Sequence, residues 1–399
     1  MSSPLYYQAL TRFVGQPPLW TPMPGSVQLC EDSGQYFRDK NAARFPKHPL
    51  EPAVAACLAV CPNLPADIDV VACGSTLGNL LRFVRGQGKP FRMLVEKVGN
   101  TVFFIRREDC PTELIPGVRG YGHSFPEAFT TWESTVRGSA SHQRVIRYAF
   151  GGLDFLVRFE ADGYIKDGVT DSKPRSQKAT PGGGLNPAQP QPSPPASFDE
   201  LATLLSVNTS TGPQKPTTQT SQLQIDVGGK FIDRSQLFDL KTRSIATVNR
   251  DHLVEELPRL WVSQIPNFIL AFHERGMFHP SNIHVSNVCE DVQQWEDEHN
   301  DELRQLGALV RRIVNLSSST KARNCKLELC HVTIGRLDVR GQLPDAGDVL
   351  SESLRARWEA ASDGVLSERD EAGMSSYEWN ETGEEDFTAC SEFCSYCGR

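Results

Sequence analysis

Two short charged motifs lie near the ends of segments that are predicted to be β-strands. Residues 160–162 read Glu-Ala-Asp, and residues 239–241 read Asp-Leu-Lys. Because alternate residues of a strand point to the same face, Glu160 and Asp162 are expected to lie together, and so are Asp239 and Lys241. Three carboxylates and one ammonium group could then converge on one site.

Such a group of side chains suits a hard divalent cation such as Mg²⁺, which prefers oxygen ligands. A metal ion held between carboxylates can activate a water molecule and neutralise charge that builds on a phosphoryl group. A lysine beside the metal can orient that water or stabilise the transition state. Both patterns are also common by chance, and the alternative is two exposed strand ends with solvated charges.

Two further motifs supply candidate polar groups. Residues 122–127, Gly-His-Ser-Phe-Pro-Glu, offer Glu127 as a fourth carboxylate. The same residues fit a helix-capping box in which Ser124 and Glu127 satisfy free backbone N–H groups. Residues 261–264, Trp-Val-Ser-Gln, offer the Gln264 amide to a nucleotide or to the attacking water. The alternative there is a helix whose tryptophan packs in the core.

In order along the chain, these motifs resemble those of the DXO-type decapping exoribonucleases. That family carries Gly-Φ-x-Φ-Glu, Glu-Φ-Asp and Glu-Φ-Lys motifs, where Φ is apolar, followed by a helix that contains Trp and Gln. The order and approximate spacing agree once residues 166–222 are removed. The resemblance covers roughly residues 67–316. The acidic pairs are also similar to the PD-(D/E)xK nuclease site.

The resemblance implies a metal-dependent hydrolase that removes nucleotides, pyrophosphate or aberrant caps from RNA 5′ ends. It implies a bound Mg²⁺ or Mn²⁺ ion, a lysine that stabilises charge and a glutamine that positions the substrate. The expected metal ligands, directly or through water, are Glu127, Glu160, Asp162 and Asp239, and the other two groups are Lys241 and Gln264.

Three features depart from the family pattern. Gly74 or Ser75 stands where the family has an arginine in its first motif. Pro126 adds a residue before Glu127, and Asp239, with its shorter reach, replaces the usual glutamate. The alternative function is therefore a catalytically inactive RNA-binding or protein-binding scaffold on the same fold.

The elements expected to position these motifs form an α+β pattern, with a mixed or antiparallel sheet core of hairpins flanked by helices, as in the DXO family. The dipeptides Gly99-Asn100 and Gly151-Gly152 favour two-residue turns, and each therefore predicts a hairpin. Strands are predicted at 68–73, 91–98, 101–107, 144–149, 153–160, 222–227, 236–245, 326–334 and 336–341, and helices at 251–272, broken near two prolines, and at 288–316.

Composition divides the chain into one domain, an insertion and a tail. Residues 1–165 and 223–345 are predicted to be the two halves of a catalytic-type domain. Residues 166–222, rich in Pro, Gly, Ser, Thr and Gln, are predicted to be a disordered insertion, because they cannot bury enough apolar surface to offset their ordering entropy. A linker between two domains is the alternative. Residues 346–399 are predicted to be an acidic, largely disordered tail.

The net charge of −8 arises in residues 351–399, where twelve acidic residues face four basic ones, so the rest of the chain is neutral and compatible with a basic groove. No apolar run approaches the roughly 18 residues that span a bilayer, and the first residues lack a secretory pattern. We therefore expect no membrane contact and a location in the nucleus or cytoplasm. A protein partner would bind the insertion or the tail.

The eleven cysteines are then expected to be thiols, since disulfides are rare in reducing compartments. Three of them, Cys390, Cys394 and Cys397, have spacings that suit Zn²⁺ if a fourth ligand such as Cys110 or a histidine joins them. The alternative is an unstructured terminus that binds no metal.

Overall fold

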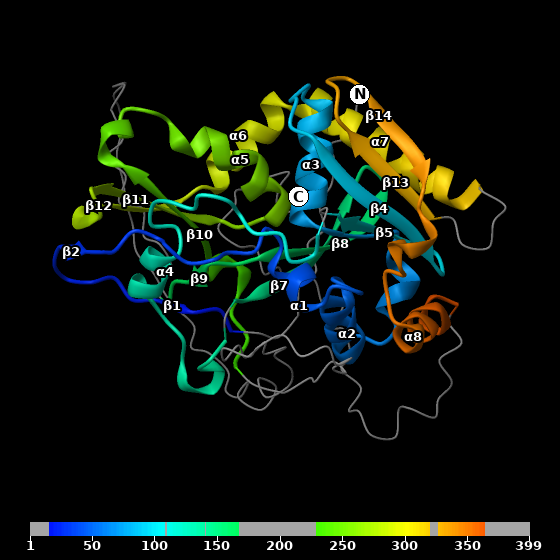
Figure 1. Ribbon diagram of the computed structural model, residues 1–399, viewed down its shortest axis with the longest axis horizontal. Helices are drawn as coiled ribbons and strands as arrows, with labels where there is room; N and C mark the ends of the chain where they lie inside the picture. The colour runs from blue at the N-terminus through cyan, green and yellow to red at the C-terminus, as the bar shows by residue number, and fades with distance from the viewer. Residues whose placement is uncertain (1–15, 108–109, 140, 167–228, 320–325, 364–399) are drawn as a thin grey trace, which may run out of the picture.

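A computed structural model describes residues 16–107, 110–139, 141–166, 229–319 and 326–363 (Figure 1). The insertion beyond residue 166, the strand expected at 222–227 and the three terminal cysteines lie outside these ranges. Across the described ranges, no helix combines the length and the apolar character that a membrane crossing requires.

One sheet of seven strands contains the two hairpins expected from the turn residues. Its strand order is β14-β13-β4-β5-β3-β8-β7. Val98 pairs with Thr101, and Phe150 pairs with Leu153, so both two-residue turns are confirmed. Strand β3 runs parallel to both β5 and β8, and the sheet is therefore mixed. The strands are β3 (Val70–Cys73), β4 (Phe91–Val98), β5 (Thr101–Arg106), β7 (Gln143–Phe150), β8 (Leu153–Glu160), β13 (Lys326–His331) and β14 (Leu337–Gly341).

Helices cover both faces of this sheet, and its side chains alternate between two hydrophobic clusters. Val70 and Ala72 belong to the cluster that includes helices α3, α5, α6 and α7, whereas Val71 belongs to the cluster that includes α2 and α8. The helices are α2 (Glu51–Val60), α3 (Gly74–Val84), α5 (His252–Ser263), α6 (Cys289–Glu298), α7 (Asn300–Ser319) and α8 (Glu352–Ser362).

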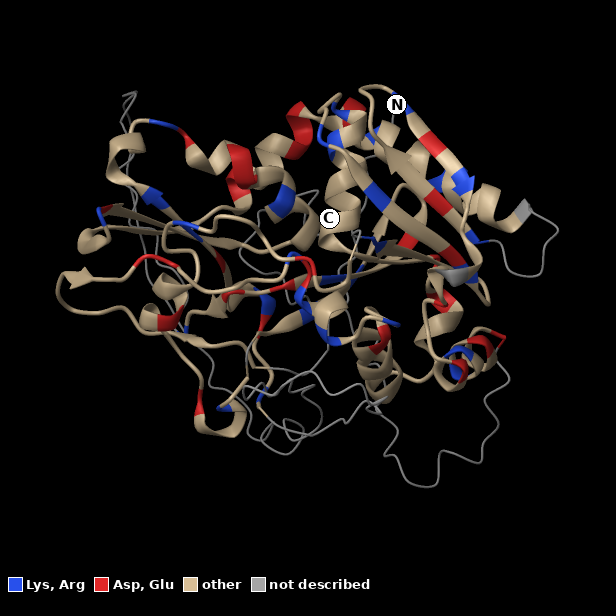
Figure 2. Ribbon diagram, in the orientation of Figure 1, with Lys and Arg blue, Asp and Glu red and all other residues tan. Residues whose placement is uncertain are grey.

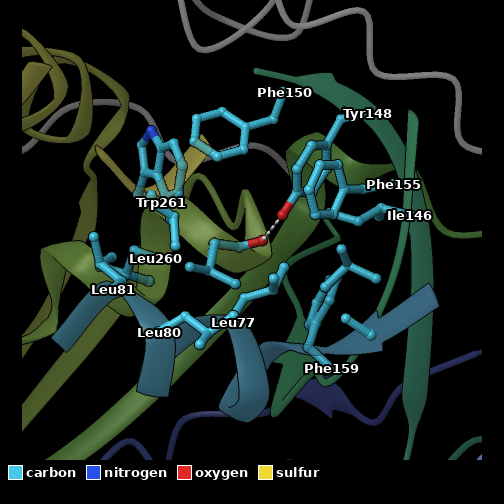
Figure 3. Packing of buried hydrophobic residues seen from close by; sticks show 14 of the residues in the cluster. Leu77, Leu80, Leu81, Ile146, Tyr148, Phe150, Phe155, Phe159, Leu260 and Trp261 are labelled. Carbon is cyan, nitrogen blue, oxygen red and sulfur yellow. Dashed lines mark hydrogen bonds between the residues drawn. The ribbon is translucent and has the colours of Figure 1, made fainter. Parts of the chain in front are cut away.

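Helix α5 is fixed to the first sheet by its apolar face, as Figure 3 shows. The ring of Trp261 lies 5.4 Å from that of Phe150, edge to face, and its indole N–H donates to Glu296 of α6 at 3.1 Å. The Tyr148 hydroxyl donates to the carbonyl oxygen of Val262 at 3.3 Å. These contacts set the direction in which the opposite face of α5 presents its charged residues.

A second sheet, also of seven strands, has the order β2-β12-β11-β10-β9-β1-β6. Strand β10 is parallel to β11 and antiparallel to β9, so this sheet is mixed as well, and the expected α+β class is confirmed. The strands are β1 (Leu19–Trp20), β2 (Val27–Gln28), β6 (Thr130–Thr131), β9 (Gly163–Tyr164), β10 (Leu237–Ser244), β11 (Asn267–Glu274) and β12 (Met277–Asn287). Helix α4 (Ser124–Phe129) packs on it, and the short helix α1 (Lys40–Arg44) precedes α2 along the chain.

The segments on the two sides of the insertion are neighbouring strands of the second sheet. Leu237 of β10 pairs with Tyr164 of β9, and Phe238 pairs with Gly163. The cluster Phe125, Phe129 and Phe278 covers one face of this sheet. Residues far apart along the chain are thus joined in one hydrogen-bonded layer.

The helix expected over 251–272 is wrong in its second half. Helix α5 ends at Ser263, and Asn267–Glu274 is β11, an interior strand of the second sheet. A short apolar run fits a buried strand or a buried helix equally well, and here Pro266 interrupts the helix before the run begins. The helix expected over 288–316 is present as α6 and α7, which meet at His299.

The boundary of the acidic tail also needs correction, because residues 346–363 belong to the folded body. Helix α8 buries Leu354 and Trp358 in the cluster below the first sheet. Trp358 is fully buried, and its indole N–H donates to the Thr101 hydroxyl at 3.0 Å. High charge in this segment obscured two apolar residues four positions apart, which lie on one helix face.

We expect Trp358→Phe to lower the free energy of unfolding by about 1 to 2 kcal/mol, because it removes one hydrogen bond and leaves a small cavity. Urea denaturation measures the change. Arg357→Ala, at an exposed position of the same helix, is the matched control and is expected to change stability by less than about 0.5 kcal/mol. Equal effects of the two substitutions would mean that α8 does not pack as described.

Candidate active site at the junction of the two sheets

The chain passes from the first sheet to the second between β8 and β9; Glu160 is the last residue of β8, and Asp162 lies in this crossing. The Asp162 Oδ2 atom accepts a hydrogen bond from the backbone N–H of Leu240 at 2.7 Å. This bond holds Asp162 beside β10, where Asp239 and Lys241 flank Leu240. The two motifs predicted to share a site therefore meet across the insertion.

The charges at this junction interact with one another. Burial, and then the negative charges of Asp239 and Glu160, raise the pKa of the Asp162 carboxyl to about 7, while Lys241 acts in the opposite direction. Burial also opposes ionisation of Asp239, but the positive charges of Arg259 and Lys241 outweigh it and lower the pKa of Asp239. One acidic group is thus held as a carboxylate beside another that is easily protonated.

Three cations neutralise these carboxylates. Arg259 of α5 binds both oxygens of Asp239, with a distance of 2.6 Å from Nη2 to Oδ1. The Lys241 Nζ atom lies 4.0 Å from Asp239 Oδ1. Lys40, the first residue of α1, donates to Glu160 Oε1 at 2.9 Å. Figure 2 shows that acidic and basic segments are interspersed over the fold in this view.

Glu127, the fourth expected carboxylate, is exposed in the first turn of α4. Among the described residues, no hydrogen bond or ion pair joins the Glu127 side chain to the residues of the junction. The capping box expected around Ser124 does not form, because no side-chain cap bond is made at the start of α4. Instead, the Asp32 carboxylate accepts hydrogen bonds from the backbone N–H groups of His123 and Ser124, both at 2.9 Å.

Gln264 lies at the end of α5 and is only 1% exposed. Its backbone adopts the left-handed conformation, with φ of 52°, and its Oε1 atom accepts a hydrogen bond from Arg234 at 2.6 Å. The structure therefore places the Gln264 amide in a buried polar contact with Arg234, three residues before β10 begins. Trp261 packs in the core, as the alternative interpretation of this motif expected.

The position of the family's first-motif arginine is filled by the start of helix α3. A Cβ atom on Gly74 would lie 3.6 Å from the side chain of Phe159 and 3.8 Å from that of Val262, so this backbone packs closely against β8 and α5. The next arginines along the helix are engaged elsewhere. Arg82 bonds Asn79, and the Arg85 guanidinium lies over the Trp295 ring at 5.6 Å.

The carboxylates at the junction are the type of donor that a hard divalent ion prefers, but their arrangement does not form a site for one. Asp239 is occupied by Arg259, Glu160 by Lys40, and Asp162 accepts the Leu240 N–H. Within the described ranges, no three His, Cys, Asp or Glu side chains are grouped so as to hold a metal ion. The expected zinc ligands lie outside these ranges, and Cys110 is exposed.

The residue that sequence reasoning missed is Arg259. It stands two positions before Trp261 on α5, and it also bonds Glu256 through Nε at 3.0 Å. Because a short connection joins β10 to α5, the helix was expected to pack near the strand. An arginine on that helix could therefore have been considered as a partner of Asp239. Lys40 was equally unexpected, because nothing in its local sequence connects it with Glu160, which lies 120 residues away.

Burial at the same crossing also predicts an acid-sensitive step in stability. His142, whose carbonyl accepts the Ala161 N–H, has its pKa lowered to about 3 by burial and, in addition, by the nearby Arg144. Between this pKa and the ordinary histidine value of about 6.5, the unfolded chain protonates this histidine, whereas the folded protein keeps it neutral. Acid therefore favours the unfolded state, and the free energy of unfolding should fall as pH drops from about 6.5 towards 3. His142→Gln should flatten that slope in urea denaturation between pH 7 and 4. An unchanged slope would contradict the assignment.

The fold of this chain is that of Scheffersomyces stipitis Rai1, which confirms at the level of fold the resemblance seen in the motifs. The Scheffersomyces stipitis Rai1 in complex with (3'-NADP)+ and calcium ion has 11% sequence identity and a TM-score of 0.53, and the match covers 90% of this chain and 96% of that one. S. pombe Rai1 has 9% sequence identity and a TM-score of 0.46, and the match covers 86% of this chain and 94% of that one. K. lactis Dxo1 in complex with manganese has 8% sequence identity and a TM-score of 0.41, and the match covers 85% of this chain and 98% of that one.

By sequence, the chain belongs to the family described as Domain of unknown function (DUF8563), which matches residues 6–182 and 187–329. The search of curated proteins gave no match. The family description specifies no activity, so a function has to be argued from the junction itself.

Proposed function

We propose that this chain binds the 5′ ends of RNA at the junction of the two sheets and hydrolyses a phosphate ester or anhydride bond there. The observation that carries the proposal is the meeting of Asp162, Asp239 and Lys241 from the two sides of the insertion. This meeting occurs on a fold whose S. stipitis representative was solved with a nucleotide, (3'-NADP)+.

A row of cations beside these carboxylates supports binding of a polyanion. Residues 239, 241 and 243 share one face of β10, because successive strand residues alternate. Lys241 and Arg243 on this face have side chains that are 32% and 29% exposed, and Arg259 of α5 is 43% exposed. Partly exposed cations on a rigid strand and helix can contact phosphate oxygens and still be held in place.

The chain's own residues can be given roles in such a reaction. The Lys241 ammonium would stabilise negative charge that develops on the phosphoryl oxygens. The carboxylates of Asp162 and Glu160 would orient the attacking water and accept its proton. A divalent ion in such a site would supply water activation and charge neutralisation, but because the arrangement does not form a site for one, we assign no step to it.

The second candidate is a catalytically inactive RNA-binding scaffold on the same fold. It is favoured by the Arg259–Asp239 pair, which occupies a carboxylate that the resemblance assigns to the metal. It is also favoured by Gly74 or Ser75, one of which stands where the resemblance places the first-motif arginine. This candidate retains the row of cations and therefore the binding of RNA. It differs from the first only in turnover.

The test incubates the purified full-length chain with short RNAs that carry a 5′ monophosphate, a 5′ triphosphate, an unmethylated cap or a dinucleotide cap, with and without Mn²⁺. Release of product from at least one of them, lost in Asp162→Asn, is the result expected for the hydrolase. Binding of these RNAs without any product would favour the scaffold. Neither binding nor product would show that the chain does not act on RNA 5′ ends.

A further inference from the structure

The pair of Arg259 and Asp239 has features that a stability role alone does not explain. Asp239 has a side chain that is only 2% exposed, yet its cation partner is 43% exposed at the surface of the junction. Both oxygens of the carboxylate are taken by the planar guanidinium. Bidentate pairing of this kind uses the same lone pairs that a metal ion would need.

The guanidinium of Arg259 is also held from its other side. Its Nη2 lies 2.9 Å from Glu256 Oε2, one turn earlier on α5, and Glu256 in turn accepts a hydrogen bond from Arg243 at 3.2 Å. Two carboxylates therefore fix the orientation of one guanidinium. A cation that is fixed in this way, and still partly open to solvent, is prepared to meet an anion.

The charges at the junction balance without any ion. The acidic groups Asp162, Asp239, Glu160 and Glu256 face the basic groups Arg259, Lys241, Lys40 and Arg243, four against four. A divalent cation added to this arrangement would lie close to the positive charges of Arg259 and Lys241, which flank the Asp239 carboxylate that it requires. Coulomb repulsion at such short separations disfavours its binding.

We propose that the Arg259 guanidinium takes the place that a divalent ion holds in sites built from paired carboxylates, so that the chain binds the phosphate of its substrate without a metal ion. The inference rests on the proposed function, because it assigns the phosphate to the same cluster. Arginine suits this role, since it remains charged while Asp239 and Glu256 hold it, and the second N–H of its Nη1 atom is left to donate to a phosphate oxygen.

The test measures Mn²⁺ binding, by electron paramagnetic resonance of the free ion, to the wild type, Arg259→Gln and the double variant Arg259→Gln with Asp239→Asn. The wild type is expected to show no saturable binding below roughly 1 mM, a weak-affinity limit. Arg259→Gln is expected to bind at least about ten-fold more tightly, because it frees a buried carboxylate, and the double variant should lose the gain. Arg259→Lys, which keeps one charge but not the fork, should lie between them.

Two results would overturn the proposal. One is saturable Mn²⁺ binding to the wild type that Asp239→Asn abolishes, and the other is an Arg259→Gln variant that is folded by circular dichroism and gains no binding. Affinity for 5′-phosphorylated RNA is measured separately in excess chelator. It should be the same as with Mn²⁺ in the wild type and about ten-fold weaker in Arg259→Gln. If the wild type bound no RNA in either buffer, the proposed function would fail, whereas the Mn²⁺ titrations would still decide whether Arg259 excludes the metal.

Discussion

Lys241→Ala is expected to reduce release of product from RNA 5′ ends by about 100-fold to 1000-fold, the range found when a donor that stabilises developing charge is removed. The ammonium lies 4.0 Å from Asp239 and is partly exposed, so it can reach a phosphoryl oxygen and still be held by the aspartate. Initial rates with the most reactive RNA from the panel of 5′ ends, at saturating substrate, measure the effect.

Lys326→Ala is the matched control for this loss. Lys326 is a partly exposed lysine on a strand, paired with Asp348 at 2.7 Å, but it belongs to β13 at the other side of the first sheet. Its removal should leave the rate unchanged within about two-fold. Lys241→Arg, which keeps the positive charge, should recover part of the rate. Equal rates for wild type and Lys241→Ala would remove Lys241 from the reaction.

The second large effect is a strong energetic coupling between Asp239 and Arg259. Arg259→Gln should lower the free energy of unfolding by about 2 to 4 kcal/mol, because the buried Asp239 carboxylate loses its bidentate cation and keeps the more distant Lys241. Asp239→Asn should cost less, about 1 to 2 kcal/mol, because the partly exposed guanidinium can be solvated. The double variant should be more stable than the sum of the two losses predicts, by about 1 to 3 kcal/mol.

A cycle on Asp301 and Arg304 of α7 provides the comparison. These residues are three positions apart, pair at 3.0 Å and are 84% and 52% exposed. Their coupling should be below about 0.5 kcal/mol, since exposed ion pairs contribute little. Urea denaturation of all six variants gives both values. Additive losses at Asp239 and Arg259 would mean that the bidentate pair is not formed in solution.

Much of the fold was predictable because its signals are local. Hairpins at Gly99-Asn100 and Gly151-Gly152 follow from turn chemistry. The amphipathic spacing of 288–316 predicted one helix, where the structure has two that meet at His299. The strand at Asn267–Glu274 was missed because an apolar run buried on both faces has no period. The order of strands in the two sheets depends on contacts between distant segments and could not be derived from the sequence.

For the site, the alternation of side chains along a strand predicts which residues of one motif lie together, but not which other elements supply their partners. That rule places Glu160 with Asp162 and Asp239 with Lys241, and the hydrogen bond from Leu240 to Asp162 joins the two motifs. The partners of these groups, Arg259 and Lys40, come from elements whose approach is set by packing. Sequence motifs identified the acidic residues and Lys241, but not Arg259 and Lys40, which pair with Asp239 and Glu160.

The most direct test of this account is a crystal structure of the chain with a short 5′-phosphorylated RNA bound. We expect the 5′ phosphate to lie within hydrogen-bond distance of Lys241 and Arg259, with the scissile bond facing Asp162 at the junction of the two sheets. RNA bound on another face of the molecule, or a 5′ end that points away from this junction, would contradict it.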